Sequence, residues 1–214
     1  MTTTQTTKVY IIDDHAIVRE GLKQILADTP DITVAGDADT ADEALILARQ
    51  QAYNVLLLDI TMPARNGLDI LKQIKKESPT VAVLMLSMHD EDQYAIRSLK
   101  AGAAGYLNKQ GAPTELVDAI REVAAGRKYI TPALAQTLAN QVSAKNAIAP
   151  HEELSHREYQ TMIMIASGKC VSDIAIELDL SVKTVSMYRA RLLQKMQLKN
   201  NAEIMRYAMK NSLV

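Results

Sequence analysis

Five short apolar runs alternate with amphipathic segments through the first 125 residues, and this alternation restricts the fold more than any other feature. The amphipathic segments repeat at helical spacing, whereas the apolar runs are too short for buried helices and fit buried strands. The expected strands are residues 8–12, 32–36, 55–58, 81–86 and 104–107, and the expected helices are residues 16–27, 41–50, 68–76, 92–101 and 114–125. Strands that alternate with helices predict a doubly wound, five-stranded parallel sheet.

Polar residues with a common chemistry stand where four of these strands end. Asp13 and Asp14 follow the first strand, Asp59 the third, Ser87 the fourth and Lys109 the fifth. The carboxyl ends of parallel strands meet at one sheet edge, where ligands bind in such folds. Carboxylates are ligands of Mg²⁺, and a carboxylate can attack a phosphorus atom when cations neutralise the transferred oxygens. We therefore expect a magnesium and phosphoryl site with Asp59 as nucleophile.

Each of these residues also fits a plain structural role by itself. Asp13 and Asp14 precede an amphipathic segment and fit a helix cap, Asp59 fits a turn, and Lys109 fits an exposed charge. Their joint placement after four strands favours a magnesium and phosphoryl site over these separate structural roles. The first strand is followed by neither a Gly-x-Gly-x-x-Gly sequence nor a Walker phosphate loop, so nucleotide binding lacks its usual sequence support. His89, two residues past Ser87, fits an exposed loop.

The length of 214 residues fits two domains better than one small domain. No apolar stretch is long enough to span a membrane, and the threonine-rich start, for which we expect disorder over residues 1–7, lacks the apolar segment of a signal peptide. The single cysteine, Cys170, excludes an intramolecular disulfide. We therefore expect a cytoplasmic protein without membrane contact.

A change in composition after residue 125 predicts the domain boundary. We expect a first domain over residues 8–125, a linker over residues 126–150 and a second domain over residues 151–214. Within the linker, residues 131–141 fit a short helix with Thr131 at its start and Pro132 in its first turn.

The sequence of the second domain predicts a helix-turn-helix. Ser155 and Glu158 match a capping box at the start of one helix, a short helix fits residues 172–178, and Ser181 caps a longer helix over residues 182–196. This last segment and its flanks, residues 180–202, contain five basic and no acidic residues, and Val185, Leu192 and Met196 recur on an interior face. A basic helix of this kind can enter the major groove of DNA, although a solvated amphipathic helix has a similar pattern.

The first domain resembles the receiver domain of two-component response regulators, which has a flavodoxin-like fold, through the motifs IIDDH, LLLDITMPARNG, LMLSMHD and AGAAGYLNK. The resemblance implies that Asp59 is the phosphoacceptor and that Mg²⁺ is bound by Asp13, Asp14, Asp59 and the carbonyl of Thr61. It further implies phosphate pairing by Lys109 and a conformational switch through Ser87 and Tyr106, although Tyr106 also fits plain core packing. Gln110 departs from the family pattern, in which proline often follows the lysine.

The second domain resembles the LuxR-type helix-turn-helix through LSHREYQTMIMIASGK, IAIELDLSVKTVSMYRARLLQKMQL and NNAEI, and the domain order resembles the NarL/FixJ subfamily. The resemblance implies DNA contacts by residues of the basic helix, namely Lys183, Thr184, Val185, Tyr188 and Arg189 toward the groove and Arg191 and Lys195 toward phosphates. Tyr188, Cys170 and Asn201 depart from the residues common at these positions, which are histidine, serine or threonine, and arginine.

These resemblances imply a transcription factor that is controlled by phosphorylation, not an enzyme. Its partners would be a histidine kinase, double-stranded DNA and, when phosphorylated, a second copy of the same chain. Two other functions remain open: a phosphorylation-independent DNA-binding regulator whose receiver serves as a dimerisation scaffold, and a Mg²⁺-dependent phosphohydrolase. Thr61 argues against the latter, because haloacid-type phosphatases have a second acid two residues after the nucleophile.

Overall fold

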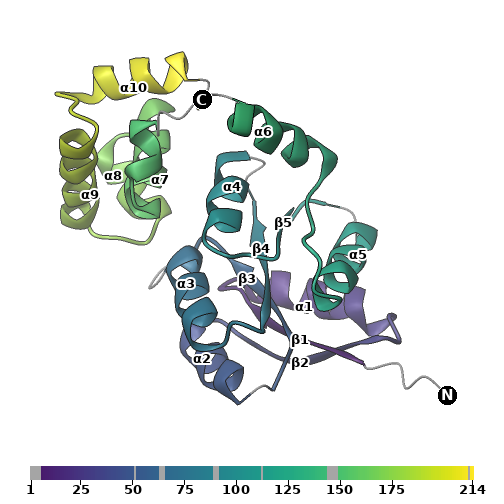
Figure 1. The fold of residues 1–214 in the computed structure, drawn as a ribbon. Coiled ribbons are helices and arrows are strands. Elements are labelled where there is room, and N and C mark those ends of the chain that lie inside the picture. The colour runs from purple at the N-terminus through teal and green to yellow at the C-terminus, as the bar shows by residue number, and fades with distance from the viewer. Residues whose placement is uncertain are drawn as a thin grey trace. The chain divides into compact units, whose positions relative to one another are not determined.

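The computed structural model describes residues 6–50, 52–62, 66–88, 92–111, 113–143, 149–211 and 213–214 (Figure 1). The chain divides into two compact units, Met1–Ala144 and Lys145–Val214. His89 and most of the predicted linker segment after residue 143 lie outside the described residues. No helix in the described part of the chain is long and apolar enough to cross a membrane.

The first unit contains the predicted parallel sheet, with strand order β2-β1-β3-β4-β5. Every neighbouring pair is parallel, so all five strands end at the same edge. The strands are β1 (Thr7–Ile12), β2 (Ile32–Ala38), β3 (Val55–Asp59), β4 (Ala82–Ser87) and β5 (Gly105–Asn108). Thr7 pairs with Ile32, so the expected disorder does not extend to residue 7.

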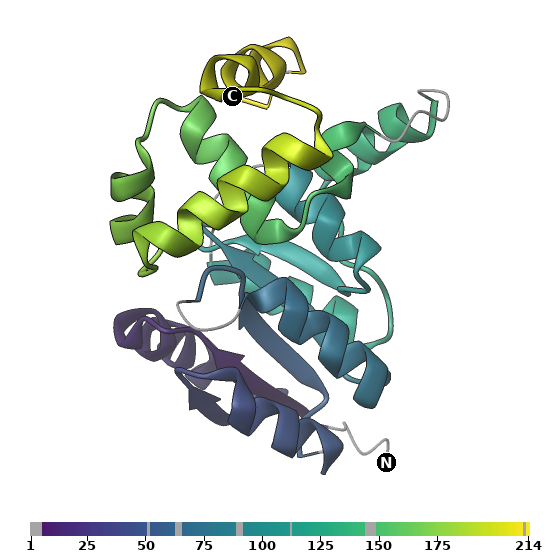
Figure 2. The same cartoon turned by 90° about the vertical axis from the view of Figure 1, so that its left-hand side faces the viewer.

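Helices cover both faces of this sheet (Figures 1 and 2). Alternate residues of the strands point to opposite faces. Val9 and Leu57 lie in a buried apolar cluster with Ile120, and Leu22 packs against that cluster. The helices of this unit are α1 (Ala16–Ala27), α2 (Ala41–Arg49), α3 (Gly67–Glu77), α4 (Asp92–Lys100), α5 (Pro113–Ala124) and α6 (Pro132–Ser143).

The first unit extends past the predicted boundary at residue 125. The Tyr129 backbone N–H donates to the carbonyl of Ala104 at 2.9 Å, and Tyr129 forms a parallel bridge with Gly105 at the β5 edge. Thr131 Oγ1 then accepts from the Leu134 N–H at 3.3 Å, as predicted for the start of α6, and Leu134 is buried. The segment that follows α5 is therefore packed on the sheet domain instead of lying free.

The second unit is entirely helical. It comprises the short 3-10 helix η1 (Pro150–Glu153) and helices α7 (His156–Ala166), α8 (Val171–Glu177), α9 (Val182–Lys195) and α10 (Asn201–Lys210). The predicted capping box is present: Ser155 N–H donates to Glu158 Oε2 at 2.8 Å, and Glu158 N–H donates to Ser155 Oγ at 3.4 Å. Asp179, with φ of 50°, makes the tight turn between α8 and α9. Helix α10 was not among the helices derived from capping and periodicity.

Candidate functional site

The strand ends bring the predicted acids, serine and lysine to one edge of the sheet. Asp13 directly follows β1, Asp59 and Ser87 end β3 and β4, and Lys109 directly follows β5. Three of these residues are buried, with at most 2% of their surface exposed: Asp13, Asp59 and Ser87. Buried carboxylates are costly unless they are paired with a cation, so their position in the core indicates a binding site instead of ordinary turn residues.

Lys109 pairs with both buried acids. Its Nζ lies 2.6 Å from Asp13 Oδ2 and 3.0 Å from Asp59 Oδ2, and its side chain is nearly buried. The Lys109 backbone N–H donates to the Ser87 carbonyl at 2.7 Å, which fixes the lysine against the end of β4. One lysine thus neutralises one of two buried charges, which leaves the pocket with an excess of negative charge.

Asp14 and His15 complete the rim of this acid pocket, which we define as Asp13, Asp14, His15, Asp59 and Lys109. The His15 backbone N–H donates to Asp13 Oδ1 at 3.0 Å, and His15 Nδ1 lies 2.9 Å from Asp14 Oδ1. His15, and neither acid, is the N-cap of α1, and no side chain caps this helix. The alternative that the two acids cap the helix is therefore wrong.

The electrostatics of Asp59 favour a bound cation. Burial raises the pKa of Asp59, Lys109 opposes this rise and the negative charge of Asp13 adds to it, and the net result is a pKa of about 6. One potential metal-ligating atom from each of Asp13, Asp14, His15 and Asp59 lies within 4.8 Å of the others. This acidic set has the character of a Mg²⁺ site, because Mg²⁺ takes a few carboxylate oxygens and completes its octahedron with water or phosphate oxygens.

The loop after Asp59 requires a glycine that sequence reasoning treated only as punctuation. The Gly67 N–H donates to the carbonyl of Ile60 at 3.0 Å, and a Cβ on Gly67 would lie 2.1 Å from the Asp59 carbonyl oxygen. Asn66 caps α3 by accepting from the Leu68 N–H at 2.8 Å. The Asn-Gly pair therefore lets α3 begin against the back of Asp59. Thr61, the predicted carbonyl ligand, lies in this loop and its N–H donates to Asp59.

Ser87 and Tyr106, the two predicted switch residues, lie on the neighbouring strands β4 and β5. Ser87 is opposite Asn108 across β4 and β5, and Tyr106 is opposite Met85. Tyr106 is buried, which agrees with the core-packing alternative, and it also lines a cavity of about 540 Å³ together with Leu134 of α6. Thus Tyr106, a residue of β5, lines a cavity that α6 also lines.

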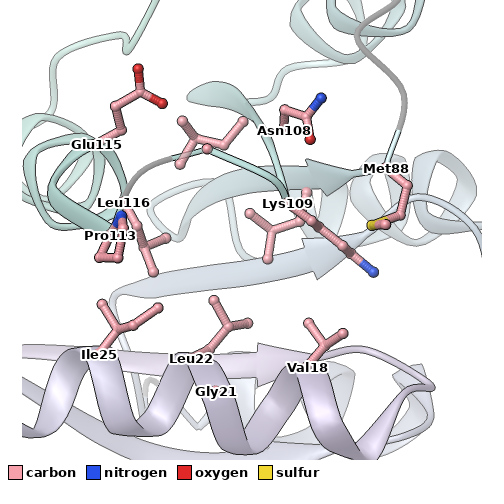
Figure 3. A pocket seen from close by; sticks show the side chains of 13 residues that line it. Val18, Gly21, Leu22, Ile25, Met88, Asn108, Lys109, Pro113, Glu115 and Leu116 are labelled. Atoms are coloured by element: carbon pink, nitrogen blue, oxygen red, sulfur yellow. The ribbon is translucent and has the colours of Figure 1, made fainter.

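A second cavity, of about 300 Å³, adjoins the acid pocket on the side of α1 and α5 (Figure 3). Val18, Leu22 and Ile25 project from α1 toward Leu116 of α5, and Lys109 lies along the wall. Its lining is mainly apolar, so the carbon stem of Lys109 lies along an apolar wall on this side of the ion pair. Sequence reasoning did not find this cavity.

In the second unit, α9 has the two faces that its sequence predicts. Val185 and Leu192 are fully buried and Met196 nearly so, which confirms the predicted interior face. The prediction that Val185 also contacts DNA is wrong, because a side chain with no exposed surface cannot reach a base edge. The sequence pattern and the family resemblance imply two incompatible roles for this residue, and its burial excludes the DNA contact.

The outward face of α9 includes two exposed residues that sequence reasoning did not single out, Met187 and Ala190. Lys183 is exposed, as predicted, and so are Ser186, Met187 and Ala190, which recur at helical spacing from it. Arg191 is exposed as well, whereas Thr184 is partly buried. Helical periodicity could have identified this face from the sequence, because residues 183, 186, 187 and 190 lie on the side of the helix opposite Val185 and Leu192.

Two further predicted DNA-contact residues, Arg189 and Lys195, are paired within the unit. Arg189 Nε donates to Asn201 Oδ1 at 2.7 Å, and Lys195 Nζ donates to Glu158 Oε2 at 2.6 Å. Tyr188 is half-buried. Burial would raise the pKa of Glu158, but hydrogen bonds from Lys195 and Ser155 outweigh it and lower that pKa. Lys195 therefore stabilises the unit by pairing with a buried acid.

The helix that precedes α9 begins at one of the positions that depart from the family pattern. Cys170 is the N-cap residue of α8, and its backbone N–H donates to Asp173 Oδ2 at 3.4 Å. Its thiol does not take the strong capping role of a hydroxyl, so the acid three residues later supplies the cap.

Fold and sites together define a class: a response regulator with an acidic receiver and a helix-turn-helix that binds DNA. Residues 9–121 match the response regulator receiver domain, and residues 152–208 match the bacterial regulatory proteins of the luxR family. The chain belongs to the response regulators that join these two domains, the NarL/FixJ family. It is a transcription factor of this type and not an enzyme.

Several known proteins are similar along nearly the whole chain. Response regulator UvrY of Escherichia coli strain K12 is 38% identical over 206 residues, which cover 96% of this chain and 94% of UvrY. Response regulator GacA of Pseudomonas aeruginosa is 37% identical over 97% of both chains. The structure of RcsB from Salmonella enterica serovar Typhimurium superposes with a TM-score of 0.63 at 26% identity and covers 94% of this chain and 98% of RcsB.

Proposed function

We propose that Asp59 accepts a phosphoryl group from a partner histidine kinase in the presence of Mg²⁺, and that this modification switches dimerisation and DNA binding by α9. The observation that carries the proposal is the ion cluster of Asp13, Asp59 and Lys109, which is buried at the carboxyl edge of the sheet. In this assignment, residues 8–125 form the receiver and residues 151–214 the DNA-binding domain. The chromosome is the target, so the protein acts in the cytoplasm.

Phosphoryl transfer follows from the chemistry of the pocket. An Asp59 oxygen attacks the phosphorus of a phosphohistidine, the new O–P bond forms as the P–N bond breaks, and the imidazole leaves with its bonding electron pair and takes up a proton. Because burial raises the pKa of Asp59 only to about 6, most of this carboxyl is ionised at neutral pH and can attack. Mg²⁺ would be held by Asp13, Asp14, Asp59 and the Thr61 carbonyl, and it would neutralise charge on the transferred group.

Lys109 and Ser87 are the side chains that would rearrange when Asp59 is phosphorylated. Lys109 Nζ now pairs with two carboxylates, and formation of an acyl phosphate on Asp59 removes one of these charges, so that Lys109 can pair with the phosphoryl oxygens. The hydroxyl of Ser87, at the end of β4, is close along the same edge and would turn toward the new oxygens. Movement of Ser87 can pass along β4 and β5 to Tyr106, which lines the cavity beside α6.

The DNA-binding surface is the outward face of α9. Lys183 and Arg191 supply positive charge, and Ser186 and Met187 supply short polar and apolar contacts for base edges. Thr184 and Tyr188 flank this face, and Arg189 and Lys195 would need to leave Asn201 and Glu158 to reach DNA. Related structures support such a role: RcsB has been solved on a promoter in the presence of BeF₃⁻, and two RcsB dimers have been solved on two DNAs. We extend dimeric DNA binding to this chain.

The test measures DNA affinity with and without a phosphoryl mimic. Duplexes enriched by the protein from a random library are titrated by fluorescence polarisation, with Mg²⁺ alone and with Mg²⁺ plus BeF₃⁻. We expect tighter binding and a dimer by light scattering only with BeF₃⁻. Asp59→Asn should abolish this response, whereas Asp69→Asn, an exposed acid on α3, should retain it. Equal affinity in both conditions, with the mimic shown to bind, would instead support phosphorylation-independent regulation.

A further inference from the structure

His15 is the one member of the acid pocket to which the proposed phosphoryl chemistry gives no role. Its Nδ1 lies 2.9 Å from Asp14 Oδ1 and 3.3 Å from Asp13 Oδ1. Its backbone is fixed because its N–H donates to Asp13 Oδ1, while its ring remains accessible to water. An imidazole nitrogen is therefore held among the carboxylates at the mouth of the pocket.

The oxygen of Asp14 that lies nearest the His15 ring is buried. Asp14 Oδ1 accepts no hydrogen bond among the described residues, and His15 Nδ1 approaches it within 2.9 Å. A neutral imidazole nitrogen and a carboxylate oxygen this close to each other can both bind the same cation.

The separations also fit ligands of a single ion. Around an octahedral ion with metal–ligand distances of about 2.1 Å, neighbouring ligand atoms are about 3.0 Å apart. The distances from Nδ1 to the Asp14 and Asp13 oxygens, 2.9 and 3.3 Å, lie on either side of this value. One ion can therefore bond to the imidazole and to these carboxylates after only a small adjustment.

We infer that His15 is a metal ligand of the acid pocket and shifts its ion preference toward divalent transition ions that accept nitrogen as well as oxygen, such as Fe²⁺, Co²⁺ or Ni²⁺. Mg²⁺ prefers oxygen ligands, whereas imidazole suits the later transition ions. The inference rests on the proposed function, because it concerns the same pocket. Asp59 and Asp13 would hold either ion, and His15 would discriminate between them.

The direct test detects the nitrogen bond with Mn²⁺ as a paramagnetic probe. The full chain is loaded with one equivalent of Mn²⁺ at about pH 8, where an ordinary imidazole is neutral, and electron spin echo modulation is recorded for ¹⁴N coupling. We expect coupling in the wild type and in the exposed-site control Asp69→Asn. His15→Gln should bind Mn²⁺ without this coupling. A wild type that binds Mn²⁺ without ¹⁴N coupling, or coupling that persists in His15→Gln, would overturn the inference.

Calorimetric titrations with Ni²⁺ and Mg²⁺ give the specificity. We expect His15→Gln to weaken Ni²⁺ binding about tenfold and to change Mg²⁺ binding less than about threefold. Tighter binding of both ions by His15→Gln would show that His15 only competes with metal for Asp14, which overturns the inference and leaves the proposed function standing. If Asp59→Asn binds these ions as well as the wild type, the pocket is not the ion site, and the proposed function falls with the inference.

Discussion

The buried charge of Asp59 should cost the metal-free protein stability at neutral pH. Burial and Asp13 raise the pKa of Asp59 from about 3.8 to about 6 in the folded state. A shift of about two units corresponds to about 3 kcal/mol of unfolding free energy. Because the folded pKa is the higher one, this stabilisation is fully present below about pH 4 and is lost as the pH rises through about 6. Between pH 5 and pH 8 the loss amounts to about 1.4 kcal/mol.

Asp59→Asn removes the titrating charge and keeps the shape of the side chain. We therefore expect the variant to be more stable than the wild type at neutral pH in EDTA, by about 3 kcal/mol at most, with a difference that grows by about 1.4 kcal/mol from pH 5 to pH 8. Amide hydrogen exchange on peptides of β3, corrected for the intrinsic rate at each pH, reports unfolding of the first unit separately from the second. Saturating Mg²⁺ should stabilise the wild type more than the variant.

Asp69→Asn provides the control, because Asp69 is an exposed acid on the neighbouring helix. Its stability should follow the wild type at every pH. If the wild type and Asp59→Asn show parallel pH profiles in EDTA, then the charge of Asp59 is already balanced without metal. That result would refute the reasoning that the pocket is short of positive charge.

The second unit gives three further predictions. Arg191→Ala should weaken DNA binding and reduce the slope of log affinity against log salt by about one, as measured by polarisation over a salt series; an unchanged slope would remove Arg191, an exposed residue of α9, from the phosphate contacts. Val185→Ala should destabilise the unit by about 1–3 kcal/mol in exchange measurements on α7 peptides, since the side chain is fully buried. Lys195→Met should lower the unfolding free energy of the second unit by about 1–2 kcal/mol at neutral pH, and by less as the pH falls through the lowered pKa of Glu158. A loss of DNA affinity at unchanged stability would contradict the assignment of Lys195 as the partner of Glu158.

Sequence reasoning predicted the sheet and the composition of the acid pocket, because both depend on local rules. Apolar runs alternate with helical segments, and parallel strands bring their carboxyl ends to one edge, so Asp13, Asp59 and Lys109 must converge once the strands are placed. The role of His15 in the pocket was not predicted, since a histidine at a helix start has no distinctive spacing. Its contact with Asp14 depends on the direction of the chain after β1.

The packing of long side chains was harder to predict than their position along a helix. Arg189 and Lys195 belong to a basic stripe in the sequence, yet their partners Asn201 and Glu158 lie on other helices. Such pairs depend on tertiary contacts that periodicity does not contain. In the same way, the continuation of the first unit through Tyr129 depends on pairing with the β5 edge, which a change of composition cannot reveal.

The most direct test of the central claim is the mass of the intact protein after incubation with Mg²⁺ and a small phosphodonor, followed by identification of the modified residue. We predict one phosphoryl adduct, located on Asp59, and none on Asp59→Asn. An adduct that forms equally on Asp59→Asn, or its absence from the folded wild type while another receiver is labelled under the same conditions, would contradict the assignment of Asp59 as the phosphoacceptor.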